Sequence, residues 1–481
     1  MRILLTGATG YVGRRLLLRL AEEQGLELQV LVRHSVKFGP PPRPDIKVFE
    51  GSTFDGDALR SALEDVEIAY YLVHSLGAKG NLQALERRSA ENFREACLEA
   101  GVKRVIYLGG LGEKATASAH LKSRLETGEI LGAQPDRLRL LWFRAGIVIG
   151  SGSASFEIIR HLLQKLPVLI APRWIGTRTQ PIGIDDVLRY LRAGLDADLR
   201  ENAMVDIGAE VLSFRQMLLG AARVMGLRRR LIPMPLLTVR LSSTWLALIT
   251  PVPYRIARLL MEGLKSETIS LNEEAARLFP GIRPLSYEQA FAAALAEIEG
   301  RQVVSRWCDS DAAQACNLQE PEASARAIFR DERRLDFAPL DPARVFRSVL
   351  SVGGNEGWPA FNLLWRIRGA WDKVTGGPGL GRSRRDPFHL RPGDALDFWR
   401  VVDVRPGRRL LLAAEMKLPG KAWLEYTIEG TALRQVAHFW PRGLGGRLYW
   451  WAFKPVHALV FPRLTRKIVA RARMMSPMNP Q

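Results

Sequence analysis

The chain has 481 residues, of which 47% are hydrophobic and 25% are charged, a composition typical of a folded globular protein with two to four domains. Its three cysteines, Cys97, Cys308 and Cys316, share no metal-ligand or redox spacing, so we expect neither a disulfide framework nor a metal site. The first apolar strand begins at Arg2, which leaves no room for a signal peptide and favours a cytoplasmic location.

Charge is distributed unevenly along the chain. The net charge is +19, and residues 331–481 hold 26 Lys and Arg against 13 Asp and Glu. Basic surfaces attract anionic membranes or ligands, and the alternative is that these charges are simply solvated. We expect no nucleic-acid partner. Prolines and charged residues interrupt the apolar stretches 231–264 and 448–462, so a peripheral membrane contact is open but no transmembrane helix is predicted.

Apolar strands and amphipathic helices alternate through the first 150 residues. The predicted strands span 2–6, 28–32, 47–50, 68–73, 104–108 and 138–149. The predicted helices span 11–24, 57–63, 81–100 and 120–131. This alternation predicts an α/β fold with a doubly wound parallel Rossmann sheet and right-handed crossovers.

The pattern weakens after residue 155. A strand running into a helix is predicted over 179–187, and two helices are predicted over 214–225 and 287–299. The polar segment 301–326 is predicted to be a linker. A second domain, 327–481, is predicted to be α+β. Its expected elements are strands over 327–337, 395–403, 409–417 and 422–429 and a helical stretch over 448–473.

The first strand leads into a glycine-rich turn, Thr6-Gly7-Ala8-Thr9-Gly10-Tyr11-Val12-Gly13, that opens a helix. Gly7 permits the tight turn, Gly10 lets the backbone approach a pyrophosphate, and Gly13 lets the helix pack against the strand. The helix N-terminus adds N–H groups and a positive dipole end. The residues expected to contact a nicotinamide dinucleotide are Gly7, Thr9, Gly10, Tyr11, Val12 and Gly13, with Val73 and Leu108 at the ends of later strands.

Arg33 and His34 follow the second strand, at the place where an acidic residue would bind the ribose 2′-hydroxyl of NAD. Cations there suit a 2′-phosphate, so we expect NADP(H) as the cofactor in preference to NAD(H). The alternative is that Arg33 is an ordinary surface arginine in an arginine-rich chain.

Three further motifs accompany the glycine-rich turn. They are Tyr70-Tyr71-Leu72-Val73-His74-Ser75, Tyr107-Leu108-Gly109-Gly110-Leu111-Gly112 and Gln180-Pro181-Ile182-Gly183-Ile184-Asp185-Asp186-Val187. Together they resemble the atypical, NmrA-like group of the short-chain dehydrogenase/reductase superfamily, which includes redox-sensing regulators and an accessory subunit of respiratory complex I. The resemblance implies an NAD(P)-binding domain over 1–300, with a Rossmann core over 1–150 and a substrate-side portion over 151–300.

Active members of that superfamily carry a Tyr-x-x-x-Lys pair on the helix after the fifth strand. The tyrosine moves a proton and the lysine holds the nicotinamide ribose. Here the matching register holds His120 and Arg124, which share a helix face. A histidine, with an ordinary pKa near ~6.5, can move a proton at neutral pH, although a nearby cation disfavours its charged form.

The superfamily's serine falls near Gly109-Gly110, where this chain has no hydroxyl. His74 and Ser75, after the fourth strand, are the alternative polar groups at the carboxyl edge of the sheet. The candidate catalytic residues are therefore His120, Arg124 and His74. A cofactor-binding domain without hydride chemistry remains the alternative.

The C-terminal part also has recognisable motifs, which are Val352-Gly353-Gly354-Asn355-Glu356-Gly357-Trp358, Trp371-Asp372-Lys373, Asp386-Pro387-Phe388 and Phe439-Trp440-Pro441-Arg442-Gly443-Leu444. They resemble an uncharacterised domain fused to such Rossmann domains in bacteria, in proteins labelled nucleoside-diphosphate-sugar epimerases. That domain is similar to the START/SRPBCC helix-grip fold, which encloses an apolar cavity. A label inherited from a fold is not evidence of a reaction.

Eight of the twelve tryptophans lie in this part: Trp358, Trp365, Trp371, Trp399, Trp423, Trp440, Trp450 and Trp451. They either form the core of the domain or wall a pocket for an apolar ligand. The cations expected beside an anionic head of that ligand are Lys373, Arg382, Arg384 and Arg385. In the tail 434–473 we expect aromatic side chains to point inward and cations outward, with weak contact to anionic membranes. Pro441, Pro455 and Pro462 are expected to divide the tail into short pieces.

We therefore expect an NADP(H)-dependent oxidoreductase of the atypical short-chain group that acts on an apolar small molecule. One alternative is a non-catalytic NADP(H)-binding redox sensor or scaffold. The other is a lipid-handling protein at the membrane surface.

Overall fold

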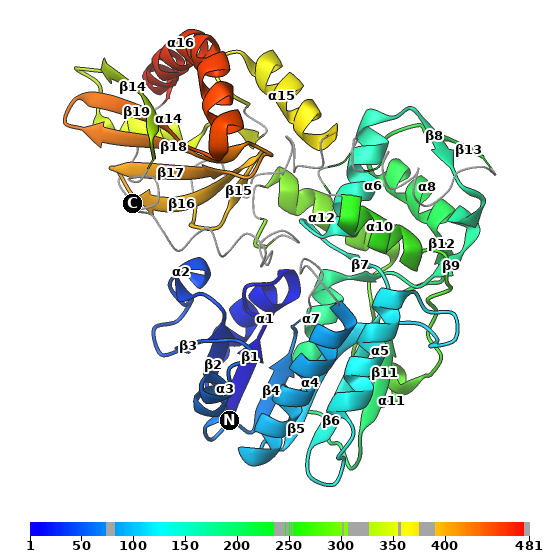
Figure 1. Ribbon diagram of the computed structural model, residues 1–481. Helices are drawn as coiled ribbons and strands as arrows, with labels where there is room; N and C mark the ends of the chain where they lie inside the picture. The colour runs from blue at the N-terminus through cyan, green and yellow to red at the C-terminus, as the bar shows by residue number, and fades with distance from the viewer. Residues whose placement is uncertain are drawn as a thin grey trace. The chain divides into compact units, whose positions relative to one another are not determined.

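The computed structural model describes residues 1–73, 82–234, 246, 250, 252, 254–300, 303–305, 327–354, 357–374 and 390–475. The chain folds as two compact units (Figure 1). Unit 1 comprises residues 1–250 and 254–313, and unit 2 comprises residues 251–253 and 314–481. Most of the predicted linker, 301–326, lies outside the described residues.

Unit 1 is built on a seven-stranded sheet with the spatial order β11-β6-β5-β4-β1-β2-β3, in which every pairing is parallel. The strands are β1 (Arg2–Thr6), β2 (Glu27–Val32), β3 (Lys47–Glu50), β4 (Ile68–Tyr71), β5 (Arg104–Gly110), β6 (Arg139–Ala145) and β11 (Ala203–Ile207). The predicted parallel sheet is confirmed. The strand order reverses between β1 and β4, which is where ligands bind in sheets of this kind.

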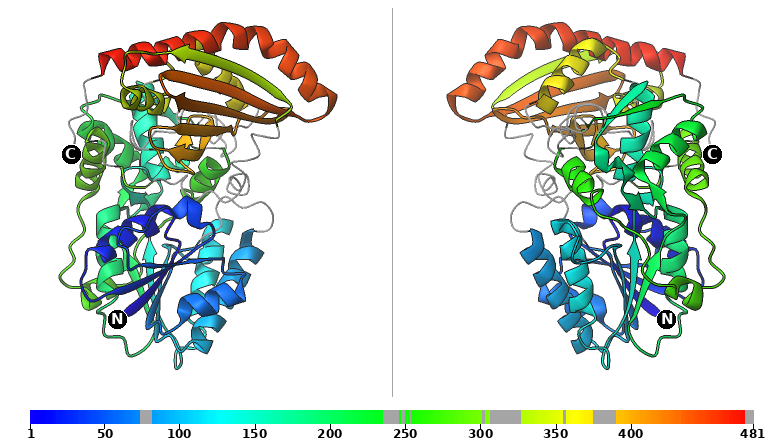
Figure 2. Two further views of the ribbon diagram at one scale, coloured as in Figure 1. Left: turned by 90° about the vertical axis from the view of Figure 1, so that its left-hand side faces the viewer. Right: turned by 90° about the vertical axis from the view of Figure 1, so that its right-hand side faces the viewer.

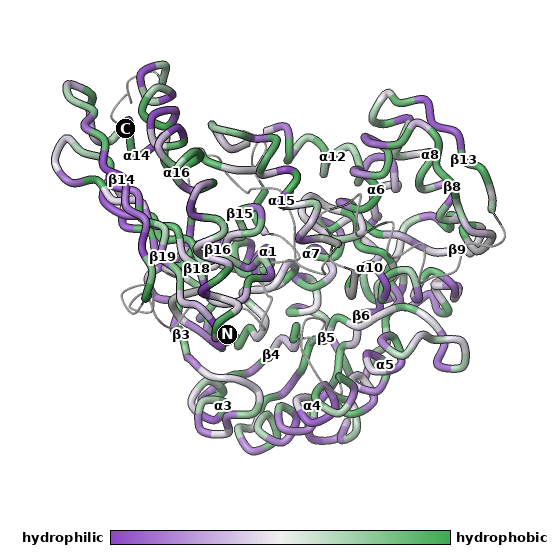
Figure 3. The backbone as a smooth tube through the Cα atoms, turned by 45° about the horizontal axis from the view of Figure 1, so that its top comes forward, coloured by the Kyte–Doolittle hydropathy of each residue, from purple (hydrophilic) through white to green (hydrophobic). Residues whose placement is uncertain are grey.

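Helices cover both faces of this sheet (Figure 1). One face carries α1 (Tyr11–Ala21) and α7 (Ile184–Ala193), and the other carries α3 (Gly56–Leu63), α4 (Leu82–Glu99) and α5 (Ala119–Leu131). The short helix α2 (Ser35–Phe38) follows β2. Hydrophobic and hydrophilic residues alternate along α3, α4 and α5, because each helix buries one side and exposes the other (Figure 3).

The prediction of one strand over 138–149 was wrong. The chain leaves the sheet after β6 and forms β7 (Val148–Ile149), which pairs with β10 (Ile182–Gly183) in a separate small sheet. Between the two strands, the backbone at Gly146 passes so close to Gln180 that a Cβ atom would lie 2.6 Å from its carbonyl oxygen. The seventh strand, β11, was not predicted. Arg144 holds it to β6 through two hydrogen bonds to the buried Asp206, of 2.6 and 2.9 Å.

The rest of unit 1 consists of shorter elements: α6 (Ala154–Lys165), β8 (Val168–Ala171), η1 (Arg173–Gly176), β9 (Arg178–Thr179), β12 (Leu212–Ser213), α8 (Phe214–Val224), β13 (Arg230–Pro233), α10 (Tyr254–Gly263), α11 (Glu274–Leu278) and α12 (Tyr287–Glu299). Helices α8 and α12 were predicted, and each begins with a capping box, on Ser213 and Ser286 respectively. An ion pair of 2.8 Å between the buried Arg15 and the half-buried Glu297 ties the end of α12 to α1.

Unit 2 contains a six-stranded antiparallel sheet with the order β14-β19-β18-β17-β16-β15. The strands are β14 (Phe329–Asp336), β15 (Ala395–Leu396), β16 (Trp399–Arg405), β17 (Arg409–Ala414), β18 (Gly420–Glu429) and β19 (Ala432–Pro441). The helices are α14 (Pro342–Leu350), α15 (Asn362–Val374) and α16 (Gly443–Met474). Strand β19 pairs with both β14 and β18 and was not predicted from the sequence.

The expectation of a divided C-terminal tail was wrong, because α16 is one helix of 32 residues that contains Pro455 and Pro462. The two prolines are one heptad apart and so lie on the same side of the helix, away from its buried side chains. A helix bends away from a proline, and α16 accordingly arches over the sheet of unit 2 (Figure 2).

The expected inward orientation of the tail aromatics was only partly correct. Trp450 and Phe461 are buried, whereas Trp440, Trp451 and Phe453 are exposed. Among the described residues, the structure has no helix that combines the length and the apolarity needed to cross a bilayer.

Candidate functional site

The glycine-rich turn between β1 and α1 requires glycine at two positions. Gly7 has a φ of +75°, and a Cβ atom there would lie 2.5 Å from the carbonyl oxygen of Leu72 at the end of β4. A Cβ atom at Gly13 would lie 2.2 Å from the carbonyl oxygen of Gly7. The turn is therefore held against β4 on one side and against α1 on the other, at the point where the strand order reverses.

Gly10 occupies the N-cap of α1 and serves a different purpose. Its N–H donates to the carbonyl oxygen of Gly7 at 2.8 Å, and its own backbone conformation, with a φ of −80°, is open to any residue. The N-cap makes no side-chain hydrogen bond, and the first turn of α1 holds no acidic residue. Uncapped helix N-termini bind anions through their N–H groups and dipole, so this turn fits the pyrophosphate of a dinucleotide.

Arg33 and His34 lie where the adenosine end of that dinucleotide would bind, after β2. Arg33 is exposed, and the His34 Nδ1 atom lies 4.0 Å from Glu50 Oε1 at the end of β3. The backbone N–H and the hydroxyl of Ser35 both donate to Glu50 Oε2, and these bonds lower the pKa of the Glu50 carboxyl. The sequence analysis missed Glu50, although an acid that ends the strand beside β2 is a detectable pattern.

Arg124 joins the ends of β4 and β5. Its guanidinium donates to the carbonyl oxygen of Leu108 and, at 3.4 Å, to that of Val73, and it lies over the Tyr107 ring at 5.1 Å. The structure therefore brings together Val73, Leu108 and Arg124, three of the predicted site residues. Two of the guanidinium N–H groups are already used for backbone carbonyls, which leaves fewer for a ribose.

His120 lies in the first turn of α5, one turn before Arg124, and is half-buried. Burial, followed by the charge of Arg124, lowers the pKa of His120 to about 4, against a smaller opposing effect of Glu86. Arg124 thus lowers the pKa of His120, as predicted for a neighbouring cation. At neutral pH the imidazole is uncharged, so it is able to accept a proton but carries no extra one to donate.

The position of the superfamily's serine is filled by other side chains. A Cβ atom at Gly109 would lie 2.3 Å from Trp142 Nε1, and one at Gly110 would lie 2.6 Å from Leu121 Cδ1. The Trp142 ring also packs against Gly128 of α5, where a Cβ atom would lie 2.5 Å away. The Trp142 indole therefore fills the space beside Gly109 and packs α5 onto the sheet.

The remaining predicted residues are placed as follows. Tyr11 lies under the Arg15 guanidinium at 5.4 Å, and burial raises the pKa of its hydroxyl. A Cβ atom at Gly150 would lie 2.5 Å from that hydroxyl, so the Tyr11 side chain extends to the backbone just after β7. Thr9 and Val12 are half-buried in the same turn. His74 lies outside the described residues.

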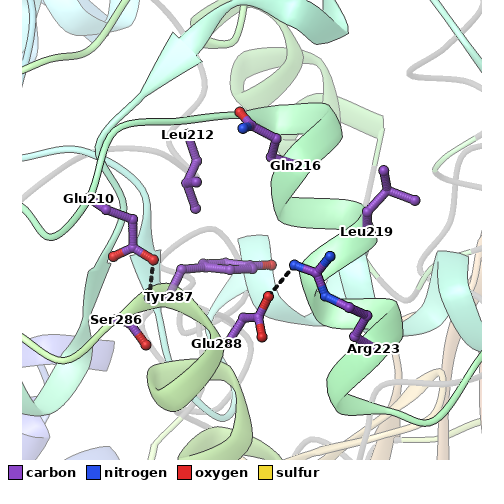
Figure 4. Close-up of a pocket in the computed structure, with 8 residues that line it drawn as sticks. All are labelled: Glu210, Leu212, Gln216, Leu219, Arg223, Ser286, Tyr287 and Glu288. Atoms are coloured by element: carbon purple, nitrogen blue, oxygen red, sulfur yellow. Dashed lines mark hydrogen bonds and ion pairs between the residues drawn. The ribbon is translucent and has the colours of Figure 1, made fainter.

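A pocket of about 340 Å³ lies between α8 and the start of α12 (Figure 4). Its walls are formed by Glu210, Leu212, Gln216, Leu219, Arg223, Ser286, Tyr287 and Glu288. The Tyr287 ring crosses its centre, Arg223 pairs with Glu288, and Glu210 accepts the Tyr287 N–H at 2.8 Å. None of the predicted site residues lines this pocket.

In unit 2, four of the eight tryptophans that we singled out belong to the buried interior: Trp358, Trp399, Trp423 and Trp450. Trp358 stacks on the half-buried Trp365 with 4.5 Å between ring centroids, and its Nε1–H donates to Asp397 at 3.0 Å. The cations expected near this cluster, Arg382, Arg384, Arg385 and the Lys373 side chain, lie outside the described part of the chain.

Comparisons with known families cover both units. Residues 7–134 match a family described as NAD(P)H-binding, and residues 323–464 match a family described as a protein of unknown function, DUF2867. The chain thus contains an NAD(P)H-binding domain. This confirms the expectation that the chain binds a nicotinamide dinucleotide. No curated protein matches the chain.

Solved structures of epimerases are similar to unit 1. One is a UDP-glucose 4-epimerase from Thermotoga maritima with UDP-glucose, at 16% identity over 62% of this chain and 99% of that chain, with a TM-score of 0.49. Another is a UDP-glucuronic acid 4-epimerase from Bacillus cereus with NAD, at 16% identity over 63% and 100%, with a TM-score of 0.47. A third is a nucleoside-diphosphate-sugar epimerase from Staphylococcus aureus, at 13% identity over 61% and 100%, with a TM-score of 0.48.

Proposed function

We propose that the chain is an NADP(H)-dependent oxidoreductase of the atypical short-chain dehydrogenase/reductase group that acts on an apolar small molecule. The observation that carries the proposal is the convergence on one sheet edge of the glycine-rich turn, the ends of β4 and β5, and the first turns of α5. Gly7 contacts the end of β4 through Leu72, and Arg124 binds the carbonyl oxygens of Val73 and Leu108.

Within this site, the glycine-rich turn and the N-terminus of α1 hold the pyrophosphate, and Arg33 binds the 2′-phosphate of the adenosine. The preference for NADP rests on Arg33, because a guanidinium is always charged and matches the geometry of a phosphate. A bound nicotinamide would supply the acceptance or donation of a hydride. Because a 2′-phosphate is dianionic, Arg33 contributes one charge-assisted contact that NAD cannot make.

His120 would exchange the proton that accompanies hydride transfer. Its lowered pKa keeps the imidazole neutral at pH 7, so it has a free nitrogen for the proton of a substrate hydroxyl, as alcohol oxidation requires, but at a pKa of about 4 it is a weak base. Arg124 would fix α5 to the end of β5 and help to keep the His120 imidazole neutral. His74 remains a proposed alternative for the same proton.

The experiment is a titration of the purified full chain with NADPH and NADH, followed by turnover assays with panels of apolar alcohols and ketones. His120→Ala is expected to abolish turnover while the cofactor dissociation constant stays unchanged. Lys122→Ala, an exposed change in the same turn of α5, is the matched control. Full activity of His120→Ala would move the chemistry to another residue, with His74→Ala as the next variant.

A second candidate is a redox sensor that binds NADP(H) without turnover. It is favoured by the filled serine position at Gly109 and by the engagement of Arg124 with backbone carbonyls. Tight cofactor binding with no turnover across both panels would support it. For unit 2 we propose an apolar ligand near Trp358 and Trp365, which native mass spectrometry of the purified chain would reveal as bound mass.

A further inference from the structure

About half of the exposed large apolar side chains among the described residues lie on two helices of unit 2. Their exposed large apolar side chains form what we call the α15/α16 face: Leu363, Leu364, Ile367 and Trp371 on α15, and Leu444, Leu448, Trp451, Val456 and Leu459 on α16. The exposed fractions of these nine side chains range from 41% to 80%. Monomeric proteins rarely expose a continuous apolar patch of this kind without a binding partner.

The first half of α16 is amphipathic with its apolar side outward. Leu444, Leu448, Trp451, Pro455 and Leu459 follow one another at spacings of four, three, four and four residues, which places them along one side of a helix. The opposite side holds Trp450, which stacks between Phe329 and Phe439 with centroid distances of 5.5 and 5.7 Å. Because Trp450 anchors the helix to the sheet, the outward stripe cannot turn inward to be buried.

Helix α15 repeats this arrangement beside α16. Leu363, Ile367 and Trp371 are exposed at intervals of four residues, while Asp372 is buried. The Arg463 guanidinium of α16 lies 5.4 Å from the ring of Phe361, which precedes α15. Arg368 of α15 also interacts with Tyr449 of α16, so the two helices lie close together and each exposes a row of apolar side chains.

Cations flank this apolar face. Arg447 and Lys454 are exposed seven residues apart on α16, and the Lys454 Nζ atom lies 4.6 Å from the centre of the Trp451 ring. Arg366 is exposed on α15. The second half of α16 adds exposed cations, Arg463, Arg466, Lys467 and Arg473, and the whole helix contains no acidic residue.

We propose that the α15/α16 face docks unit 2 onto the surface of an anionic lipid bilayer. Leucines and a tryptophan on the outward side of a helix insert at the level of the headgroups, and the flanking cations bind anionic lipids. This occupant matches both the apolarity and the charge of the face. The inference goes beyond the oxidoreductase activity and does not depend on it.

A second copy of the chain fits the same face less well. A symmetric dimer through α16 would place this helix against α16 of the second copy. Its seven Lys and Arg side chains, with no acidic residue on the helix, would then repel one another. A bilayer that contains anionic lipid removes that repulsion and adds attraction.

The experiment is co-sedimentation of the full chain with vesicles of phosphatidylcholine, alone or mixed with phosphatidylglycerol, at low and high salt. The first variant, Leu448→Glu with Trp451→Glu, puts charge into the apolar stripe. The second, Arg447→Gln with Lys454→Gln, removes two flanking cations. The matched control, Phe54→Glu with Leu271→Glu, places the same charges on exposed apolar side chains of unit 1.

We expect the wild-type chain to bind the mixed vesicles and the first variant to bind them at least roughly tenfold more weakly at both salt concentrations. The second variant should lose mainly the part of the binding that is present at low salt. The control should bind like the wild type. Because all these positions are exposed, far-ultraviolet circular dichroism should show unchanged folds.

Three results would overturn the proposal. The first is a folded wild-type chain that binds neither kind of vesicle. The second is unchanged vesicle binding by Leu448→Glu with Trp451→Glu, or an equal loss in the control. The third is a dimer by light scattering that these two substitutions dissociate, without vesicle binding by the wild type, because the face would then belong to a second copy.

Discussion

Arg124 lies one helical turn after His120 on α5, and its positive charge adds to burial in lowering the pKa of the His120 imidazole to about 4. The same guanidinium binds the carbonyl oxygen of Leu108 at the end of β5. One side chain therefore fixes the helix on the sheet edge and sets the charge state of its neighbour.

Replacing Arg124 with Gln should raise the pKa of His120 toward the ordinary value of about 6.5, because one of the two causes that lower it is removed. A histidine-selective NMR titration of the wild type and the variant measures this shift. Lys122→Gln, which removes an exposed cation from the same turn, should leave the titration unchanged. An identical His120 titration in Arg124→Gln would contradict the assigned interaction.

The lowered pKa of His120 also predicts a dependence of stability on pH. Between pH 6.5 and pH 4 the unfolded chain binds a proton at this imidazole and the folded chain does not, so the stability contribution present above pH 6.5 is lost as the pH falls. Urea unfolding of wild type and His120→Gln at pH 7 and pH 5 checks this. The loss of stability at pH 5 should be smaller in the variant; equal losses would refute the prediction.

Gly10→Val should prevent nucleotide binding without unfolding unit 1. A Cβ atom at Gly10 lies 3.1 Å from the Gly7 carbonyl, which is tight but tolerable, whereas the side chain would occupy the approach of a pyrophosphate. We expect NADPH binding to weaken at least roughly tenfold in calorimetry. Gly10→Ala should show a smaller loss. Wild-type affinity in a folded Gly10→Val variant would contradict the assigned phosphate turn.

Arg33→Asp should change the preference between the two cofactors. Reversing the charge beside the 2′-phosphate removes a charge-assisted contact, and we expect NADPH to bind roughly ten- to a hundredfold more weakly with NADH little affected. Arg283→Asp, an equal charge reversal at an exposed position of unit 1, is the control. If the ratio of the two affinities stays at its wild-type value in Arg33→Asp, then Arg33 does not read the 2′-phosphate.

Gly109→Ser tests whether the serine position is closed by packing. Its Cβ atom would lie 2.3 Å from Trp142 Nε1, so the substitution should destabilise unit 1 by about 1–3 kcal/mol in urea unfolding. Trp142→Leu should remove the clash, so that Gly109→Ser costs less in its presence. Additive effects of the two substitutions would show that the indole does not close the position.

The βα alternation of the first 131 residues was predictable because each strand is a short apolar run and each helix buries one side. The strands over 2–6 and 47–50 were predicted with their observed ends. Strand β11 was not predicted, because it carries a charged residue, Asp206, which is buried only by pairing with Arg144, 62 positions earlier in the chain. Likewise, β19 was missed because Arg434, Gln435 and His438 interrupt its apolar residues, although the fold buries Gln435 and His438.

The candidate site was predictable where glycine spacing or helical register fixes positions, as for Gly7, Gly13, His120 and Arg124. The charge contacts and hydrogen bonds within the site were harder to predict from the sequence. The approach of Glu50 to His34 and the bonds from Arg124 to backbone carbonyls arise from parallel strands that end at one edge of the sheet. Sequence reasoning does not measure such distances between separate elements.

The buried pair of Arg15 and Glu297 has a consequence for how the chain is made. Arg15 belongs to the first helix to leave the ribosome, and its partner is synthesised 282 residues later. Until then, the Arg15 guanidinium, which is 6% exposed in the finished fold, has only the carbonyl and hydroxyl oxygens of Ser151 as partners, and the ion pair with Glu297 forms last. The nucleotide-binding half should therefore remain protease-sensitive during translation and become resistant only when α12 has emerged and closed onto α1.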